Sequence, residues 1–181
     1  MKVVLKAIAV LVVCLIVALV VLSITGLDPN QRRPGLALRG DVVATLPSDW
    51  TFADTYPTLL VETHPWYRIP HSVTIYFVTH DSHLYLHADY PTGQRFPSDK
   101  GWITAVARNP NVRVKIGSQV FEGHVVMVTD RADYDALFEA FRKKYPRSPY
   151  SNYRRRPEVD FLRLVPGASS EPLTAPPSHE R

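Results

Sequence analysis

Three histidines close together in the sequence are the first candidates for chemistry. His80, His83 and His87 flank an expected tight turn that contains Asp81. A zinc site needs imidazole nitrogens that converge to about 2.0–2.1 Å from the metal. His83 and His87 would share a strand face with Tyr85, whereas His80 lies across the turn, and only Asp81 adds a nearby carboxylate. We therefore interpret these residues as exposed hairpin histidines and predict no metal site.

Ser98 and Lys100 form a second candidate, because both stand where a helix is expected to begin. Ser98 can cap this helix, which stops before Asn109-Pro110. The N-terminus of a helix presents free N–H groups and a positive dipole end to an anion, and Ser98 and Lys100 would add donors there. Asp99 between them carries a negative charge that disfavours a phosphate.

Other chemistries find little support. The sequence has no Gly-x-Ser-x-Gly motif for serine catalysis and no paired carboxylates. Cys14 is the only cysteine and lies in an apolar segment, which excludes a cysteine nucleophile and cysteine-based zinc sites from the folded domain. The net charge of +4 is modest and no long basic run alternates with aromatic residues, so nucleic acid binding is not indicated.

One basic cluster remains, and it allows three interpretations. Arg154-Arg155-Arg156 stands near Arg147, Lys143 and Lys144. We interpret the cluster as a solvated loop. The alternatives are contact with anionic headgroups or with the phosphate of a cofactor.

The elements that must position these residues are mainly β. Alternating or β-branched runs predict six strands, at residues 58–63, 72–79, 83–88, 112–116, 119–128 and 159–165. Besides the helix after Ser98, a second helix capped by Thr129 or Asp130 carries an apolar stripe of Tyr134, Leu137, Phe138, Phe141 and Tyr145. We predict a mainly β fold: a small antiparallel six-stranded barrel, closed or split, with two flanking helices.

A long apolar segment precedes this domain. Residues 3–24 would rise roughly 33 Å as a helix, which is enough to cross a bilayer, and Ala7–Ile24 holds no charge. We predict a transmembrane anchor at 3–24, a juxtamembrane linker at 25–39, the barrel at 40–166 and a disordered tail at 167–181. A cleaved signal peptide is the alternative, although Ser23-Ile24-Thr25 is a poor cleavage site.

Two arguments about the side of the membrane on which the domain lies point in opposite directions. Arg32, Arg33 and Arg39 after the span favour a cytoplasmic domain over Lys2 before it. Short N-terminal anchors of this shape more often leave the bulk of the chain outside. We favour a single-pass membrane protein with a periplasmic domain.

The order of elements resembles the pyridoxamine-5′-phosphate-oxidase-like superfamily, the FMN-binding split barrels. SVTIYFVTHDSHLYLHADY is similar to its first hairpin, and SDKGWITAVARNPNVRVKI to its Ser-x-Lys…Asn-Pro-x-Val segment. QVFEGHVVMVTDRADYDALFEAFRKKYP is similar to the strand and helix that follow. Trp50 and Glu62-Thr63 resemble membrane-anchored members that have no established activity.

This resemblance implies a homodimeric split barrel, often with FMN at the dimer interface. In the family, Ser-x-Lys contributes to holding the FMN phosphate, and the first strand adds a basic residue, where this chain has His71 and Ser72. The second strand's hydroxyl-bearing pair corresponds to Leu86-His87. The implied cofactor contacts are Ser98, Lys100, Ser72, Arg68 and His87. The loop 91–97 before the helix is longer than in the oxidases.

The resemblance implies a flavin-dependent oxidoreductase tethered to a membrane, with an unknown substrate. FMN is the expected cofactor, and a deazaflavin or haem, both bound by relatives, are alternatives. The competing interpretation is a non-enzymatic ligand-binding or interaction module that keeps the barrel but has lost the cofactor.

The anchor yields a first prediction. Full-length protein should stay with membranes through high-salt and carbonate washes, because apolar burial rather than charge would hold it. Membrane fractionation followed by mass spectrometry of the retained chain is the measurement. Recovery of a mature chain that lacks residues 1–25 would instead establish a signal peptide.

Overall fold

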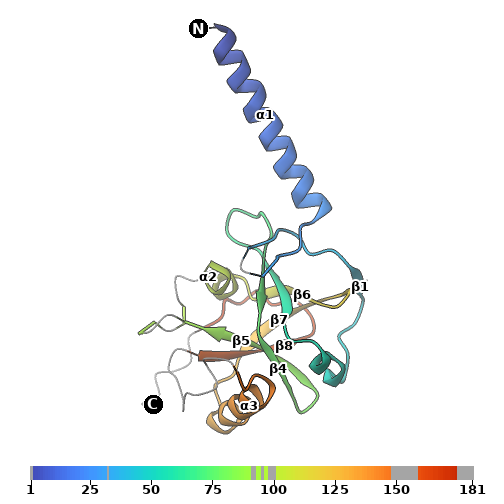
Figure 1. Cartoon of the computed structure of the whole chain (residues 1–181). Helices are drawn as coiled ribbons and strands as arrows, with labels where there is room; N and C mark the ends of the chain where they lie inside the picture. The colour runs from blue at the N-terminus through green and yellow to red at the C-terminus, as the bar shows by residue number, and fades with distance from the viewer. Residues whose placement is uncertain are drawn as a thin grey trace.

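The computed structural model describes residues 2–31, 33–90, 93–94, 96–97, 101–147 and 159–174. Figure 1 shows one long helix, α1 (Lys2–Thr25), that projects away from a rounded domain built on a curved sheet. The strands are β1 (Asp41–Val43), β2 (Leu59–Thr63), β3 (His71–Ile75), β4 (Phe77–His80), β5 (His83–Asp89), β6 (Asn111–Ile116), β7 (Gln119–Met127) and β8 (Val159–Val165). The other helices are α2 (Gly101–Arg108), α3 (Arg131–Lys144) and a 3₁₀ turn, η1 (Thr51–Thr55).

The sheet closes on itself through one bent strand. Its neighbours follow the order β3-β2-β6-β7-β8-β5-β4, and the pairs along this path are antiparallel. The two end strands, β3 and β4, are consecutive in sequence and are separated only by Tyr76. The Tyr76 carbonyl still accepts from the His87 N–H at 3.1 Å. A single bent segment therefore pairs with β2 at its start and with β5 at its end.

The predicted fold class is confirmed. The six predicted strands all form, and the predicted strand 72–79 is divided at Tyr76 into β3 and β4. Within the described residues the sheet gains β1, which pairs in parallel with β7 and was not predicted. Both hairpin turns lie where they were expected, between His80 and His83 and between Ile116 and Gln119.

Two separate cores hold the helices in place. The barrel interior forms the larger core, to which α2 contributes Trp102, Ile103 and Val106. The apolar stripe of α3 packs outside the barrel, on Val78, Tyr85, Val159 and Phe161 of β4, β5 and β8. The Asp130 side chain caps α3 by accepting from the N–H groups of Ala132 and Asp133.

The position of His87 differs from the prediction of an exposed hairpin histidine. Its side chain is buried, and the imidazole stacks on the Phe141 ring with centroids 4.2 Å apart. Alternation along β5 predicted one exposed face, but α3 covers that face and the barrel interior covers the other. His83, near the turn, remains exposed as predicted.

A segment that was expected to be a linker packs against the barrel instead of hanging free. Gly26 ends α1 with a left-handed φ of 76°. Residues 26–39, which we call the N-terminal strap, then double back, and the Leu27 N–H donates to the Ala37 carbonyl. Gly35 pairs with Ser72 of β3 through both backbone groups. A Cβ at Gly35 would lie 2.1 Å from the Leu27 carbonyl oxygen, so only glycine fits there.

One buried carboxylate fastens the strap. Glu62 of β2 is fully buried and accepts from the Leu38 N–H at 2.7 Å and from the Arg113 guanidinium at 3.0 Å. Leu38 is itself buried. Residues 167–174, predicted to belong to a disordered tail, also lie on the barrel, where the Leu173 N–H donates to the Ala107 carbonyl. Residues 175–181 lie outside the described residues.

Glu62 allows a prediction with a matched control, because Arg113 contacts two glutamates. Glu62→Gln should lower the free energy of unfolding by about 3 kcal/mol, since it removes the buried carboxylate of the ion pair and leaves Arg113 only its exposed partner, Glu122. Glu122→Gln should cost less than about 1 kcal/mol, because the Glu122 side chain is 60% exposed. Urea unfolding followed by circular dichroism measures both, and equal losses would contradict this role of Glu62.

Candidate functional site

A groove beside the N-terminus of α2 is the candidate ligand cavity. Its volume is about 570 Å³, within the range of about 300–1,000 Å³ that small-molecule sites occupy. The strap, β3, the end of β5 and the start of α2 supply its walls. The lining residues are Gln31, Arg33, Pro34, Thr58, His71, Val73, Thr74, Ile75, Tyr76, His87, Asp89, Gly101 and Trp102.

The start of α2 lies at the groove. Gly101 opens this helix and lines the cavity. A Cβ built on Gly101 would meet nothing within 4 Å, so the side of Gly101 on which a side chain would stand is open. Free backbone N–H groups and the positive end of the helix dipole favour a negative group at such a position.

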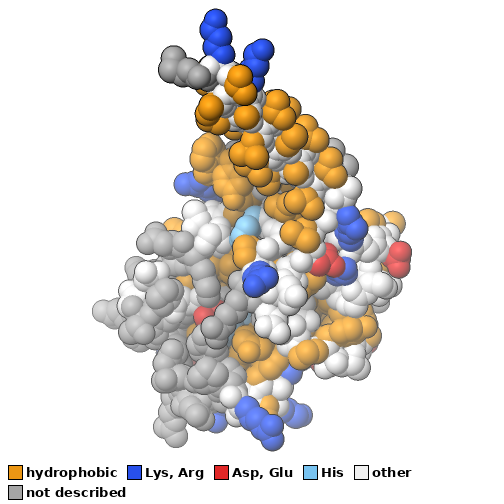
Figure 2. All heavy atoms as spheres, turned by 45° about the horizontal axis from the view of Figure 1, so that its top comes forward, with side chains coloured by type: hydrophobic (Ala, Val, Ile, Leu, Met, Phe, Trp, Pro, Cys, Tyr) orange, Lys and Arg blue, Asp and Glu red, His pale blue; other side chains and the backbone are white. Residues whose placement is uncertain are grey.

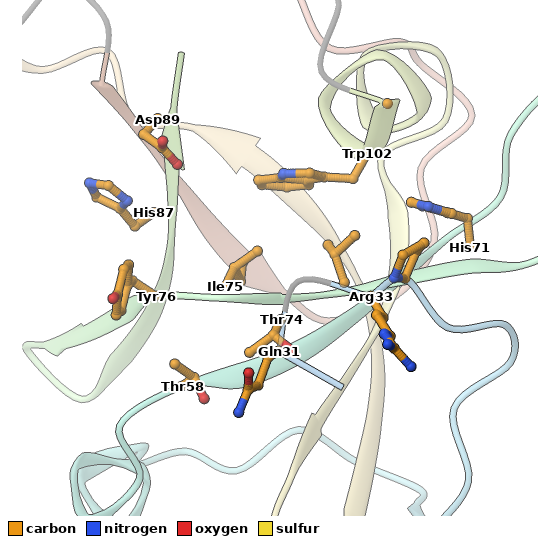
Figure 3. Close-up of a pocket in the computed structure, with 13 residues that line it drawn as sticks. Gln31, Arg33, Thr58, His71, Thr74, Ile75, Tyr76, His87, Asp89 and Trp102 are labelled. Atoms are coloured by element: carbon orange, nitrogen blue, oxygen red, sulfur yellow. The ribbon is translucent and has the colours of Figure 1, made fainter. Parts of the chain in front are cut away.

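Trp102 forms part of the groove wall. Figure 3 shows its indole lying across the cavity, with His71 on one side and Tyr76, His87 and Asp89 on the other. The indole is buried and belongs to the barrel core, so it is held in place by packing. The wall around Trp102, Ile75 and Tyr76 is apolar and aromatic, which suits a planar ring system.

Two cationic or potentially cationic side chains lie at the groove. Arg33 comes from the strap and His71 from the first position of β3. Burial lowers the pKa of His71 below its usual value, so the imidazole is mostly neutral at pH 7. Gln31, Thr58 and Thr74 add hydrogen-bonding groups, and Asp89 is the one carboxylate among the lining residues described.

The structure places the predicted cofactor residues in different surroundings. Ser98 and Lys100 lie outside the described residues, although Gly101, which follows them directly, lines the groove. His87 lines the groove, as its assignment requires. Ser72 does not line it, because its fully buried side chain lies beneath the strap beside Gly35. Arg68 is exposed in the turn before β3 and does not line it either.

Several lining residues were missed by sequence reasoning. Gln31, Arg33 and Pro34 stood in the presumed linker, where nothing in the pattern marked them as part of a site. The one sequence signal beside them is Gly35, since a glycine can mark a point at which another segment of backbone approaches closely. Trp102 was expected only as part of a helix core, and its second role as a groove wall depends on where α2 lies on the barrel.

The three hairpin histidines do not come together. Nδ1 of His83 lies 2.6 Å from the Asp81 carbonyl, while His87 is buried against Phe141. In the part of the chain that the structure describes, no group of three histidine, cysteine or acidic side chains is arranged to hold a metal ion.

Comparison with known families adds the decisive observation. The sequence profile of the F420H(2)-dependent quinone reductases matches residues 57–164, more than half of the chain. The chain belongs to this family. The match begins beside Thr58 and ends within β8, so it contains β2 to β7, α2, α3 and most of β8, whereas β1 precedes it. The strap, which supplies Arg33 to the groove, precedes the matched region.

Several solved structures are similar to this chain at low sequence identity. One described as a pyridoxamine 5′-phosphate oxidase from Listeria innocua is 16% identical, with a TM-score of 0.46 over 63% of this chain and 86% of that chain. HutZ, the haem storage protein from Vibrio cholerae, is 13% identical, with a TM-score of 0.48 over 65% and 87%. An F420H2-dependent reductase, FDR-A, is 18% identical, with a TM-score of 0.45 over 59% and 93%. No curated protein sequence matches the chain.

His71 yields a prediction about pH. An anion in the groove favours the protonated imidazole, so binding of a phosphate-bearing ligand should strengthen as the pH falls toward the lowered pKa of His71 in the free protein and should level off below it. One linked proton allows at most about a tenfold gain in affinity per pH unit. FMN fluorescence titrations between neutral and mildly acidic pH measure it. His71→Asn should flatten the dependence, apart from the phosphate's own titration, and an unchanged profile in this variant would refute the linkage.

Proposed function

We propose that this chain is a membrane-tethered reductase that binds F420 in the groove beside α2 and reduces a quinone. The observation that carries the proposal is the groove itself, which joins an anion-attracting helix terminus to an aromatic wall. Membership of a family described as F420H(2)-dependent quinone reductases supplies the cofactor and the substrate class.

The lining residues fit such a cofactor. A phosphate would meet the N–H groups at the start of α2, with the Arg33 guanidinium on the same groove. A planar ring would lie along Trp102, Ile75 and Tyr76, which exclude water from one of its faces. When bound, reduced F420 supplies a hydride to an electron acceptor. The protein's part is to bind, orient and desolvate.

Sequence reasoning favoured FMN, with a deazaflavin or haem as alternatives. F420 is a deazaflavin, so the family description supports the first alternative. FMN presents the same two features to the groove, a phosphate and a planar ring, and it therefore remains the comparison ligand. Asp89 faces the groove from the end of β5 and disfavours an anion at that end.

The membrane tether is part of the proposal. Among the described residues one helix is long and apolar enough to span a membrane: Lys2–Leu22 has a mean hydropathy of 3.2, and none of its most apolar window is buried against the domain. A signal sequence of similar length would have the same properties. The homodimer and the periplasmic side of the membrane stay predictions from the sequence.

Lys100 provides the test of the cofactor. Lys100→Ala should weaken binding of F420 or FMN about 10- to 150-fold, which corresponds to a charge-assisted hydrogen bond of roughly 1.5–3 kcal/mol. Asp99→Asn should strengthen binding, because it removes a like charge near the phosphate. Titration of the full-length protein in detergent, followed by ligand fluorescence, measures both.

Lys143 is the matched control. It is an exposed lysine in the last turn of α3, where backbone carbonyls disfavour an anion, so Lys143→Ala should leave affinity unchanged. Haem is titrated in parallel. If none of F420, FMN and haem binds at high micromolar concentration, the reductase proposal fails and the interaction module replaces it.

A further inference from the structure

The loop between β2 and β3 exposes large apolar side chains to solvent. We call residues 64–70 the aromatic loop. Trp66 is 78% exposed, Tyr67 48% and Ile69 45%, and the rings of Trp66 and Tyr67 meet edge to face with centroids 5.6 Å apart. The other tryptophans, Trp50 and Trp102, are buried. Exposed apolar side chains grouped in this way mark a contact surface.

The aromatic loop lies beside the base of α1. The strap begins at the end of α1 and pairs through Gly35 with Ser72, the second residue of β3. The loop ends at the residue before β3, so both segments are fixed to the same end of this strand. Figure 1 shows the loop rising from the barrel toward the C-terminal end of α1. In Figure 2, in which the top of Figure 1 comes forward, hydrophobic side chains of the domain are gathered beside α1.

We infer that the aromatic loop inserts into the interfacial region of the same bilayer that α1 spans. This inference rests on the membrane anchoring proposed above. Tryptophan and tyrosine are enriched at the headgroup level, because each has an apolar ring and a polar group that stays hydrated. Arg68, exposed between Tyr67 and Ile69, is placed to meet lipid phosphates. The domain therefore contacts the membrane at two points, α1 and the loop.

A lipid surface accounts for this patch better than a protein does. A stable protein interface buries about 800 Å² on each partner, whereas three partly exposed side chains of this size offer only a few hundred, at roughly 150–250 Å² per aromatic residue. Contact with a bilayer needs no such minimum area here, because α1 would already hold the loop at the membrane surface.

The contact would also orient the groove. A smaller cavity of about 330 Å³ is lined by Pro65, Trp66 and Tyr67 of the loop together with residues of α2. It shares His71 and Gly101 with the larger groove. Insertion of the loop would therefore hold this side of the groove at the surface of the bilayer.

Tryptophan fluorescence tests the inference, because Trp66 is the exposed tryptophan among the three. Full-length protein is reconstituted into phosphatidylcholine–phosphatidylglycerol vesicles with brominated or ordinary acyl chains. The contribution of Trp66 is the difference in emission between the parent protein and the Trp66→Tyr variant. Brominated chains should quench most of this contribution in the parent protein, and they should leave the emission of the Trp66→Tyr variant nearly unchanged. Since Trp66 makes few contacts, the substitution leaves the fold intact, which circular dichroism checks.

The matched control is a tryptophan at the opposite end of β2. Tyr56 is 38% exposed and precedes β2, so Tyr56→Trp in the Trp66→Tyr background should emit without quenching by brominated chains. Equal quenching at both positions, or none at Trp66 in protein that floats with the vesicles, overturns the inference. If Trp66 emission changes with protein concentration but not with bromination, the loop contacts a second copy of the chain, and this outcome also overturns the inference. Protein that fails to float at all would instead defeat the anchoring proposal.

Discussion

The carboxylate of Glu62 governs how the N-terminal segment meets the barrel. A charge buried on a central strand is costly unless it is paired and hydrogen-bonded, and Glu62 satisfies this through the Leu38 N–H and the Arg113 guanidinium. One partner belongs to the strap and the other to β6. The barrel therefore stabilises this carboxylate fully only when the strap is seated. An ion pair between Lys115 and Asp28 holds the same segment at a second position.

The groove depends on this seating and on the closure of the barrel. Arg33 reaches the cavity only because the strap lies across the start of β3. Tyr76 reaches it because the strand bends there as it changes partners from β2 to β5. The helix terminus comes from a third region, where the core residues of α2 fix its approach. Parts that are distant in sequence thus converge on one cavity, although each is positioned by its own packing.

Local patterns predicted the elements well, and tertiary arrangement explains what they missed. The stripe from Tyr134 to Phe141 identified α3, because its period depends on one helix alone. The same stripe covers the outer face of β5, and this is why His87, predicted as exposed, is buried. Arg33 and Gln31 were missed for a related reason. A polar segment rich in turn residues has the sequence pattern of a linker whether or not a buried acceptor, here the Glu62 carboxylate, binds it in the folded protein. Which side chains share the groove depends on long-range packing that no local period encodes.

The strap joins α1 to the groove, because it follows the helix directly and supplies part of the groove wall. In many membrane-tethered proteins the transmembrane helix can be exchanged or removed, because a flexible linker separates it from the soluble domain. Here a truncation that starts the chain at residue 40 would remove one wall of the groove and also the Leu38 N–H that donates to Glu62. A truncated chain should start at Gly26, directly after α1, if the groove is to keep all its walls. Substitutions in these fourteen residues are correspondingly constrained by the barrel that they cover.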